Sequence, residues 1–544
     1  MIHLITNLIM KKGLTMEKTS LKTAFSIFLF LTLSLSCKQP KNDSVAEQKP
    51  NIIYVLADDL GYGDISSFNE NGKIKTPNID QLANQGIKFT DAHTSSAVCT
   101  PTRYGILTGR YNWRSTLKSS VLTGKSKALI PNSRSTVASM LKKQGYNTAF
   151  IGKWHLGWDW ALKNIDSLGG SGWNAKDFDN IDFTKPIKNG PNDLGFTYAY
   201  GHSGSLDMAP YVYVENGNIT VVPDSITENT GKYSWWRKGP TSKDFIHDDV
   251  TPNFFRKSFK YINEKAKEDK PFFLYLALPS PHTPILPTKE WLGKSNLNPY
   301  ADFMMMIDAY MGQLTETLKQ AGIEDNTLIV FTSDNGCSPQ ADYNILKEKN
   351  HNPSYIYRGH KADIFEGGHR VPFIVKWPNK IKQGITSKET ICTTDFMATC
   401  AEISGYKLLD NEAEDSYSLM PILNQKELNK PFREATVHHS INGSFAIRKD
   451  DWKLIMCAGS GGWSFPRPGN KAAIDSLPKY QLYNLKDDPS ETNNLIATNS
   501  KKVKELKTLL TKYIVEGRST PGKSQQNDSI TFDWKQTKFI NTDL

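Results

Sequence analysis

Four short polar segments of this 544-residue sequence contain residue types that could bind a metal ion and move protons. Two of the segments supply oxygen ligands and two supply bases: Asp58 with Asp59, Asp334 with Asn335, Lys153 with His155, and His282. Three carboxylates and one amide oxygen suit calcium or magnesium and suit zinc poorly, because zinc prefers nitrogen and sulfur ligands. Each segment by itself is more often a solvated turn or a structural histidine, so a site is predicted only if the segments meet.

Each polar segment closely follows a run of apolar, β-branched and aromatic residues that predicts a buried strand. These runs lie at residues 51–57, 147–151, 271–278 and 327–332, and a fifth lies at 371–377. Helical spacing at residues 80–86, 136–145 and 301–322 predicts an α/β fold, in which helices cover both faces of one sheet. Ligand sites of open α/β sheets lie outside the carboxyl ends of the strands, so we expect the four segments to converge on one crevice.

The pattern of the chain changes after about residue 430. Residues 50–430 are predicted to form the α/β domain, with a weakly periodic insertion at 158–236 that is expected to lie over the sheet edge. Three short strands and a helix are predicted beyond it, at residues 445–448, 452–456, 481–485 and 501–516. We therefore expect a smaller C-terminal subdomain over residues 431–544, made of an antiparallel sheet and one helix.

The amino-terminal residues are typical of bacterial export. Residues 1–37 are predicted to be the signal-peptide region, with Met16 as the predicted start of translation. A short apolar run ends just before Cys37, as in lipoprotein signals. Ser34 stands where leucine is usual, so cleavage without a lipid anchor remains an alternative. Residues 38–49 form a polar linker. We expect an exported protein, periplasmic or an outer-membrane lipoprotein of a bacterium.

The formal net charge of +10 arises from 66 Lys and Arg residues against 56 Asp and Glu residues spread along the chain. A charge of this sign suits a sulfated glycan, a nucleic acid or a membrane surface, but no basic block argues for nucleic acid. No later segment of the sequence is long and apolar enough to span a bilayer. We therefore expect no nucleic-acid partner, and membrane contact only through a lipid on Cys37.

The segment around Cys99 carries the most specific motif in the sequence. Cys99 begins the run C-T-P-T-R, and Leu107 begins L-T-G-R. This pattern resembles the signature of the type I sulfatases, as do G-K-W-H-L-G from Gly152 and P-H-T-P from Pro281. The resemblance covers residues 50–495. It implies the alkaline-phosphatase-like fold, a large mixed, mostly parallel sheet sandwiched by helices, and it makes residues 50–430 the catalytic domain.

In that family the nucleophile is formylglycine, so the resemblance implies that a separate maturation enzyme oxidises Cys99. It also implies a divalent ion, calcium rather than magnesium, held by Asp58, Asp59, Asp334, Asn335 and the converted Cys99. Residue 99 precedes a predicted helix, where backbone N–H groups and the helix dipole favour an anion.

The remaining roles follow from the same resemblance. Arg103 would hold the nucleophile, and Lys153 and Lys361 would offset the charge of the sulfate. His282 would protonate the leaving alcohol. His155 would then take a proton from residue 99, so that sulfate is expelled.

The expected substrate is a sulfated carbohydrate, which His202, Asp207 and His438 could contact through sugar hydroxyls, although ordinary loop polarity explains these residues equally well. A phosphonate or phosphodiester hydrolase of the same superfamily remains the alternative enzyme. A catalytically silent glycan-binding lipoprotein remains the alternative without chemistry.

Overall fold

The computed structural model describes residues 48–164, 170–528 and 534–541. The chain separates into two units, Met1–Gln48 and Lys49–Leu544, and the second contains the helices and strands given below. The signal peptide at 1–37 and most of the linker at 38–49 lie outside the described residues, so both remain predictions. None of the helices in the described part has the length and apolarity that a membrane span requires.

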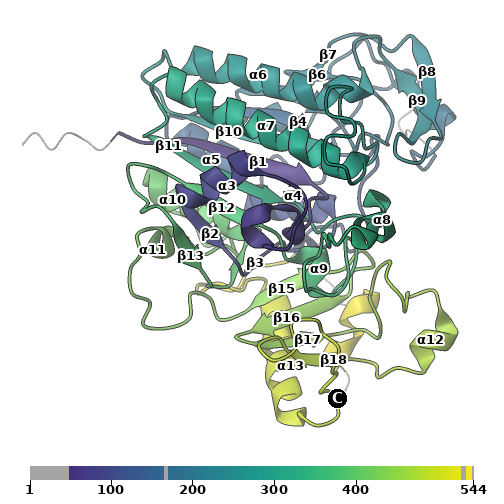
Figure 1. The fold of residues 1–544 in the computed structure, drawn as a ribbon, viewed down its shortest axis with the longest axis vertical. Helices are drawn as coiled ribbons and strands as arrows, with labels where there is room; N and C mark the ends of the chain where they lie inside the picture. The colour runs from purple at the N-terminus through teal and green to yellow at the C-terminus, as the bar shows by residue number, and fades with distance from the viewer. Residues whose placement is uncertain (1–47, 165–169, 529–533, 542–544) are drawn as a thin grey trace, which may run out of the picture. The chain divides into compact units, whose positions relative to one another are not determined.

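A ten-stranded mixed sheet forms the centre of the second unit (Figure 1). Its middle consists of five parallel strands, in the order β11 (Thr327–Ser333), β1 (Asn51–Asp58), β10 (Phe272–Pro281), β4 (Asn147–Lys153) and β5 (Tyr198–His202). The edges are β12 (Phe373–Lys376), β2 (Ile87–Phe89) and β13 (Ile385–Ser387) on one side, and β6 (Val214–Glu215) and β7 (Asn218–Ile219) on the other. Every residue of β10 and β11 is buried, as expected for strands covered on both faces.

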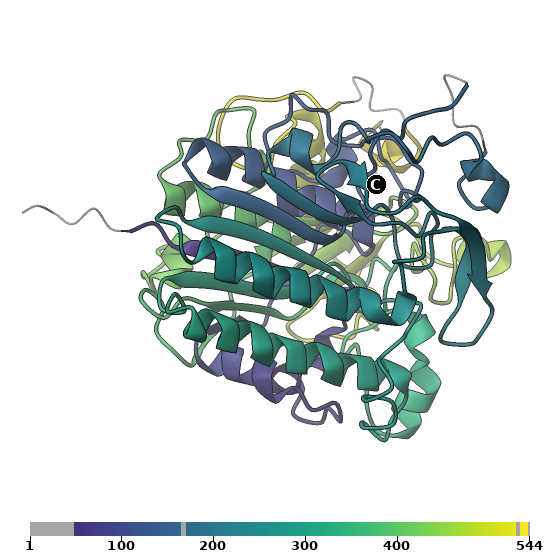
Figure 2. The ribbon, with the colours of Figure 1, turned by 90° about the horizontal axis from the view of Figure 1, so that it is seen from above.

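Helices cover both faces of this sheet (Figure 2). On one face α3 (Pro77–Asn84), α6 (Val250–Lys265) and α7 (Pro299–Gln320) pack together, and on the other α4 (Cys99–Thr108), α5 (Val137–Lys143) and α10 (Phe396–Ser404) do so. The predicted helices at 80–86, 136–145 and 301–322 are therefore confirmed, each beginning one to three residues from its predicted start. Side-chain caps explain two of these starts: the N–H of Ala301 donates to Asn298 and that of Ser139 donates to Thr136, each at 3.1 Å.

A second, four-stranded antiparallel sheet follows in the order β15 (Thr436–His439), β16 (Phe445–Lys449), β17 (Trp452–Ile455) and β18 (Gln481–Asn484). The helix α13 (Ser500–Val515) packs its apolar face on this sheet. Tyr111 and Trp113, which follow α4, belong to the same apolar cluster. The predicted fold class is confirmed, and the apolar cluster of the second sheet includes side chains from the segment that follows α4.

The insertion at 158–236 differs from the prediction, because part of it belongs to the main sheet. β5, β6 and β7 extend that sheet beyond β4, while β8 (Ser225–Asn229) and β9 (Trp236–Thr241) form a separate hairpin. The remaining short elements are β3 (Ala92–His93), β14 (Ile391–Cys392), α8 (Tyr343–Glu348), α9 (Glu366–His369), α11 (Met420–Leu423) and α12 (Lys471–Asp475).

Candidate active site

The carboxyl ends of the parallel strands bring the four polar segments together. β1 ends at Asp58 and β4 at Lys153, while His282 follows β10 and Asp334 follows β11. Parallel neighbours end at the same edge of a sheet, which explains the convergence. Asp59 has φ 66°, a left-handed conformation that is uncommon for a residue other than glycine and that clusters at functional sites.

Buried cations and carboxylates alternate at this edge. Lys153 Nζ bonds to Asp58 Oδ2, and Lys361 Nζ lies 2.7 Å from Asp59 Oδ1. Arg103 places Nη2 2.8 Å and Nε 2.9 Å from Asp334 Oδ2. Because all six side chains are almost fully enclosed, each charge depends on its partners for stability.

Two oxygen atoms in the cluster are buried without a hydrogen-bond partner, Asp58 Oδ1 and Asn335 Oδ1. The amide of Asn335 is held in place by its nitrogen, which donates to Asp59 Oδ1 at 2.7 Å and to Gly336 O at 2.9 Å. Unpaired buried oxygens are costly, and a hard cation is the partner that satisfies carboxylate and amide oxygens at once. The donor set therefore fits a divalent metal ion.

The pKa values of two acidic residues also indicate that a cation would stabilise this cluster. Burial and the charge of Asp58 raise the pKa of Asp334 to about 7, in spite of Arg103 and Lys153. Burial also disfavours the charged form of Asp58, but the charges of Lys153, His282 and Arg103 outweigh it and hold the pKa of Asp58 well below its usual range. Asp58, Asp334 and Cys99 each offer a ligand atom within 4.8 Å of the others. A further positive charge at this point would stabilise Asp334 as a carboxylate.

Cys99 is the first residue of α4 and is buried. Burial raises the pKa of its thiol to about 11, although Lys153 and Lys361 act in the opposite direction. The thiolate is the nucleophilic form of cysteine, so the unmodified side chain is a poor nucleophile at neutral pH.

The two predicted catalytic histidines present different atoms. His155 Nε2 donates to Leu122 O at 2.8 Å, and its Nδ1 is buried without a partner. Burial and the charge of Lys153 hold the pKa of His155 well below its usual range, so the ring is neutral with a lone pair on Nδ1. His282 Nδ1 donates to Thr283 O at 2.5 Å, and its Nε2 lies 3.6 Å from Asp59 Oδ2.

Of the three predicted substrate residues, Asp207 lies in contact with this cluster and His202 lies close to it. Asp207 Oδ1 is 3.9 Å from His282 Nδ1, and Asp207 Oδ2 bonds to Arg237. His202 ends β5, beside Lys153 at the end of β4, and its Nε2 is buried without a partner. Sequence reasoning missed Arg237, whose guanidinium lies 4.6 Å from the ring of Trp235, because no motif marks a residue that joins the site only through the tertiary structure.

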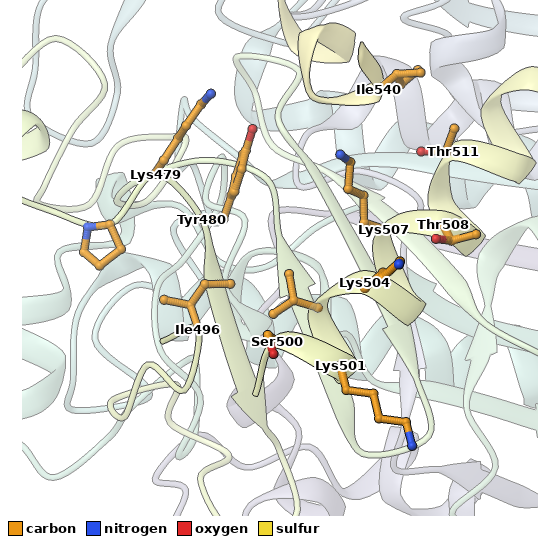
Figure 3. A pocket seen from close by; sticks show the side chains of 12 residues that line it. Lys479, Tyr480, Ile496, Ser500, Lys501, Lys504, Lys507, Thr508, Thr511 and Ile540 are labelled. Atoms are coloured by element: carbon orange, nitrogen blue, oxygen red, sulfur yellow. The ribbon is translucent and has the colours of Figure 1, made fainter. Parts of the chain in front are cut away.

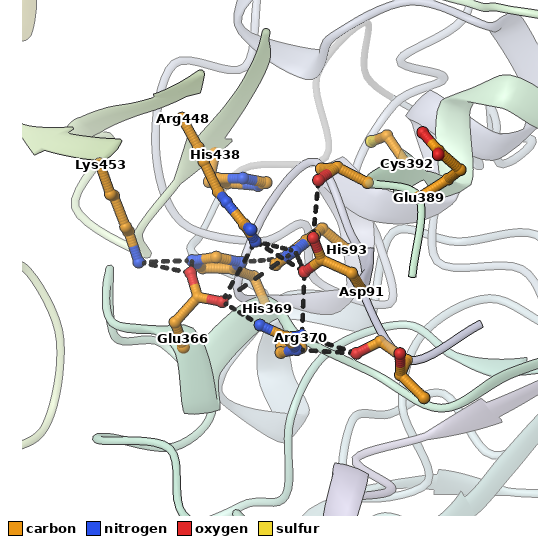
Figure 4. Close-up of polar contacts among 12 residues, drawn as sticks. Asp91, His93, Glu366, His369, Arg370, Glu389, Cys392, His438, Arg448 and Lys453 are labelled. Carbon is orange, nitrogen blue, oxygen red and sulfur yellow. Dashed lines mark hydrogen bonds and ion pairs between the residues drawn. The ribbon is translucent and has the colours of Figure 1, made fainter. Parts of the chain in front are cut away.

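The third residue, His438, lies in a different cluster, which joins the two sheets (Figure 4). Its ring stacks on His369 with centroids 3.9 Å apart and an interplanar angle of 7°, and His93 and His369 approach at 3.1 Å between their Nδ1 atoms. Lys453 Nζ donates to Glu366 Oε1 and to His369 Nε2, both at 3.0 Å. A histidine binds a metal in the plane of its ring at about 2.1 Å. Two parallel stacked rings cannot both do so with one ion, so this arrangement is a hydrogen-bond network and not a three-histidine metal site.

The cysteines in the described part, Cys99, Cys337, Cys392, Cys400 and Cys457, are free thiols. Four of them are buried and one is partly buried. Disulfide bonds among these cysteines therefore do not contribute to the stability of this part of the chain.

Comparisons with known proteins agree with this site. The Sulfatase family model matches residues 50–406, and the model of the N-sulphoglucosamine sulphohydrolase C-terminal region matches residues 360–465. An N-acetylgalactosamine-6-O-sulfatase of Bacteroides thetaiotaomicron is 33% identical over 522 residues, which cover 88% of this chain and 96% of that protein. Human arylsulfatase A is 29% identical over 486 residues, which cover 87% of this chain and 86% of that protein.

The same relationship holds in three dimensions. A solved structure described as part of the metabolism of multiple glycosaminoglycans by Bacteroides thetaiotaomicron has a TM-score of 0.73 at 32% identity, and the match covers 85% of this chain and 99% of that one. The family model alone spans well over half of the chain. This chain therefore belongs to the sulfatase family and is a sulfuric ester hydrolase.

Proposed function

We propose that this sulfatase removes 6-O-sulfate groups from galactosamine-containing glycans, with formylglycine at position 99 and a calcium ion as its cofactors. The observation that carries the proposal is the buried cluster at the carboxyl edge of the sheet, where three carboxylates, Asn335 and Cys99 meet two lysines and His282. The substrate class is supported by the 33% identity to an N-acetylgalactosamine-6-O-sulfatase over nearly the whole of that protein.

Asp58, Asp59, Asp334 and Asn335 would hold the ion. When present, the ion draws electron density from a sulfate oxygen, and formylglycine supplies a hydroxyl nucleophile where the thiol is unreactive. The side chains of the protein supply the remaining interactions with the sulfate group. Lys153 and Lys361, already among the carboxylates, offset the negative charge of the sulfate oxygens in a site closed to water.

Proton transfers fall to the two histidines. His282 Nε2 is the ring nitrogen that is free of the Thr283 carbonyl, so it is the atom that delivers a proton to the leaving alcohol. His155 Nδ1 has no hydrogen-bond partner and carries a lone pair. It is therefore the base that accepts a proton from residue 99. Arg103 acts through position: besides Asp334 it binds Lys153 O at 2.9 Å, which fixes the end of β4 against α4.

The sugar would lie between two aromatic walls. On one side Arg237, paired with Asp207 beside His282, is sandwiched between Trp173 at 4.5 Å and Trp235 at 4.6 Å. On the other side the ring of Trp463 lies 6.0 Å from Lys361 Nζ. Aromatic faces stack on pyranose rings, and the carboxylate of Asp207 can accept a hydrogen bond from a sugar hydroxyl.

The test measures sulfate release from N-acetylgalactosamine 6-sulfate, N-acetylgalactosamine 4-sulfate and N-acetylglucosamine 6-sulfate. Peptide mass spectrometry across residue 99 and metal analysis of the same protein accompany it. We expect the aldehyde mass, one bound calcium per chain and the highest kcat/KM for the first sugar. A higher kcat/KM for either other sugar would contradict the substrate, and faster hydrolysis of a phosphate diester would favour the alternative enzyme.

We also propose that the protein is exported and carries a lipid on Cys37. The proposal depends on the sequence of residues 1–37, with its short apolar run before the cysteine. Labelling of cells with a palmitate analogue should mark the protein, and a Cys37→Ala variant should lose the label. An unlabelled periplasmic protein would refute the anchor, and protein that stays in the cytoplasm would refute export.

A further inference from the structure

We propose that the C-terminal subdomain carries a second binding site, a lysine-lined groove that holds a sulfated polysaccharide chain away from the reaction centre. The groove encloses about 1070 Å³ between α13, the chain entering β18 and the end of the short helix at Lys535–Asn541 (Figure 3). This inference depends on the proposed function only for the class of glycan. The site itself follows from charge, shape and position.

The lining combines positive charge with an apolar floor. Four of its twelve residues are lysines, and none is acidic. The lining residues are Pro478, Lys479, Tyr480, Ile496, Ser500, Lys501, Val503, Lys504, Lys507, Thr508, Thr511 and Ile540. Lysine ammonium groups suit sulfate and carboxylate oxygens, while the apolar side chains suit the C–H faces of sugar rings.

Helical periodicity places this charge on one side of α13. Ser500, Lys504, Lys507 and Thr511 recur at spacings of three and four residues and so form one stripe that faces the groove. Most apolar residues of α13 pack in the apolar cluster of the second sheet, and Val503 both packs there and lines the groove. A ligand can therefore bind at this stripe without disturbing the packing of the helix.

Glu505 is the acidic residue of α13 that stands nearest to Lys501 and Lys504 in the sequence, and it pairs with other lysines. It lies 2.7 Å from Lys502 Nζ and 3.1 Å from Lys449 Nζ, and it is not among the residues that line the groove. Among the described residues, Lys501 and Lys504 form no ion pair with a carboxylate. An exposed cluster of like charges repels itself, so an anionic ligand stabilises it.

The groove is separate from the reaction centre. All of its lining residues lie between Pro478 and Ile540, whereas the residues of the reaction centre lie between Asp58 and Lys361. In Figure 1, α13 and β18 lie at the bottom of the view, and α6 and α7 lie at the top. A polymer held there would raise the local concentration of sulfate groups near the enzyme, an effect that a monosaccharide cannot use.

The experiment uses chondroitin 6-sulfate polymer as the probe and full-length protein carrying Cys99→Ala, so that binding is measured without turnover. The double variant Lys501→Glu/Lys504→Glu is compared with a matched control, Lys267→Glu/Lys270→Glu, which makes the same change of charge in the exposed turn after α6. With Cys99 intact, each double variant is also assayed on N-acetylgalactosamine 6-sulfate and on the polymer.

We expect the groove variant to bind the polymer roughly tenfold more weakly at low salt, and the control to change less than about twofold, with the difference shrinking as salt is added. The kcat/KM of the groove variant for the monosaccharide should be unchanged, and its kcat/KM for the polymer should fall. Equal losses in both double variants would show non-specific attraction and overturn the proposal. Failure of the proposed function appears differently, as no monosaccharide hydrolysis by the unaltered enzyme, and it leaves the binding comparison intact.

Discussion

Lys453 is expected to hold the second sheet against α9, and replacing it with methionine tests this directly. Lys453 Nζ lies 3.0 Å from Glu366 Oε1 and 2.8 Å from Glu491 Oε1, and all three side chains are fully buried. Methionine fills a similar volume but leaves two neighbouring carboxylates without their shared cation. Breaking a buried ion pair in this way costs about 3–5 kcal/mol, so we expect Lys453→Met to lower the free energy of unfolding by that amount.

A matched control lies on the neighbouring strand. Lys449 pairs with Glu505 at 3.1 Å, but these side chains are 30% and 39% exposed. Exposed pairs contribute about 0–1 kcal/mol, so Lys449→Met should change the stability by no more than that. Adding Glu491→Gln to Lys453→Met removes the unpaired charge and should recover a large part of the loss.

The deficit should also depend on pH with a definite sign. Burial and the charge of Glu366 raise the pKa of Glu491 to about 7 in the unaltered protein, and loss of Lys453 raises it further. A carboxyl whose folded pKa is raised stabilises the fold as pH falls through that pKa, because the folded state then binds the extra proton. The deficit of Lys453→Met should therefore be larger at pH 8.5 than at pH 6.5.

Urea unfolding followed by tryptophan fluorescence measures these differences, with kcat/KM of the folded protein as a check that the reaction centre is intact. The reasoning is refuted if Lys453→Met is no less stable than Lys449→Met, or if the added Glu491→Gln makes the loss larger.

Three further predictions follow from the two clusters. Asn335→Ala should weaken calcium binding by at least about tenfold, measured by calorimetry, since it removes an oxygen that has no other partner; unchanged affinity would exclude Asn335 as a ligand. His282→Ala should lower kcat for a sugar sulfate by about 10²–10⁴-fold and for 4-nitrophenyl sulfate much less, because nitrophenolate leaves without a proton; equal losses on both would argue against an acid role. Burial, His93 and Lys453 hold the pKa of His438 well below 6.5, so its contribution to stability is complete above that pH and is lost below it. Between pH 6.5 and 5.5, His438→Gln should reduce the fall in stability by about 1 kcal/mol, and parallel curves for variant and parent would contradict this.

The sequence alone was sufficient for the outline of the fold and for the polar segments that meet at the carboxyl edge of the main sheet. Strand residues such as those of β1 and β11 form continuous apolar runs, and a run of this kind is explained only by burial on both faces. Once those runs are parallel neighbours, the residues after them must share one edge. Asp58, Lys153, His282 and Asp334 therefore come together for a reason that is visible in the order of the sequence. The helices α6 and α10 were not predicted, and α10 is buried on nearly every side, so it lacks an amphipathic pattern.

The contacts of residues whose partners are distant in the sequence were determined only by the tertiary structure. Their contacts depend on strand order and on how the two sheets pack, and neither leaves a periodic pattern. Glu366 and Lys453 are 87 residues apart, and the stacking of His438 on His369 joins β15 to α9. For this reason the sequence grouped His438 with the sugar contacts, whereas the structure places it in the network between the sheets. The same holds for the lysine groove: the charges are visible in the sequence, but the opposite wall is formed by residues 478–480, which precede β18, and by Ile540, and only folding brings them near α13.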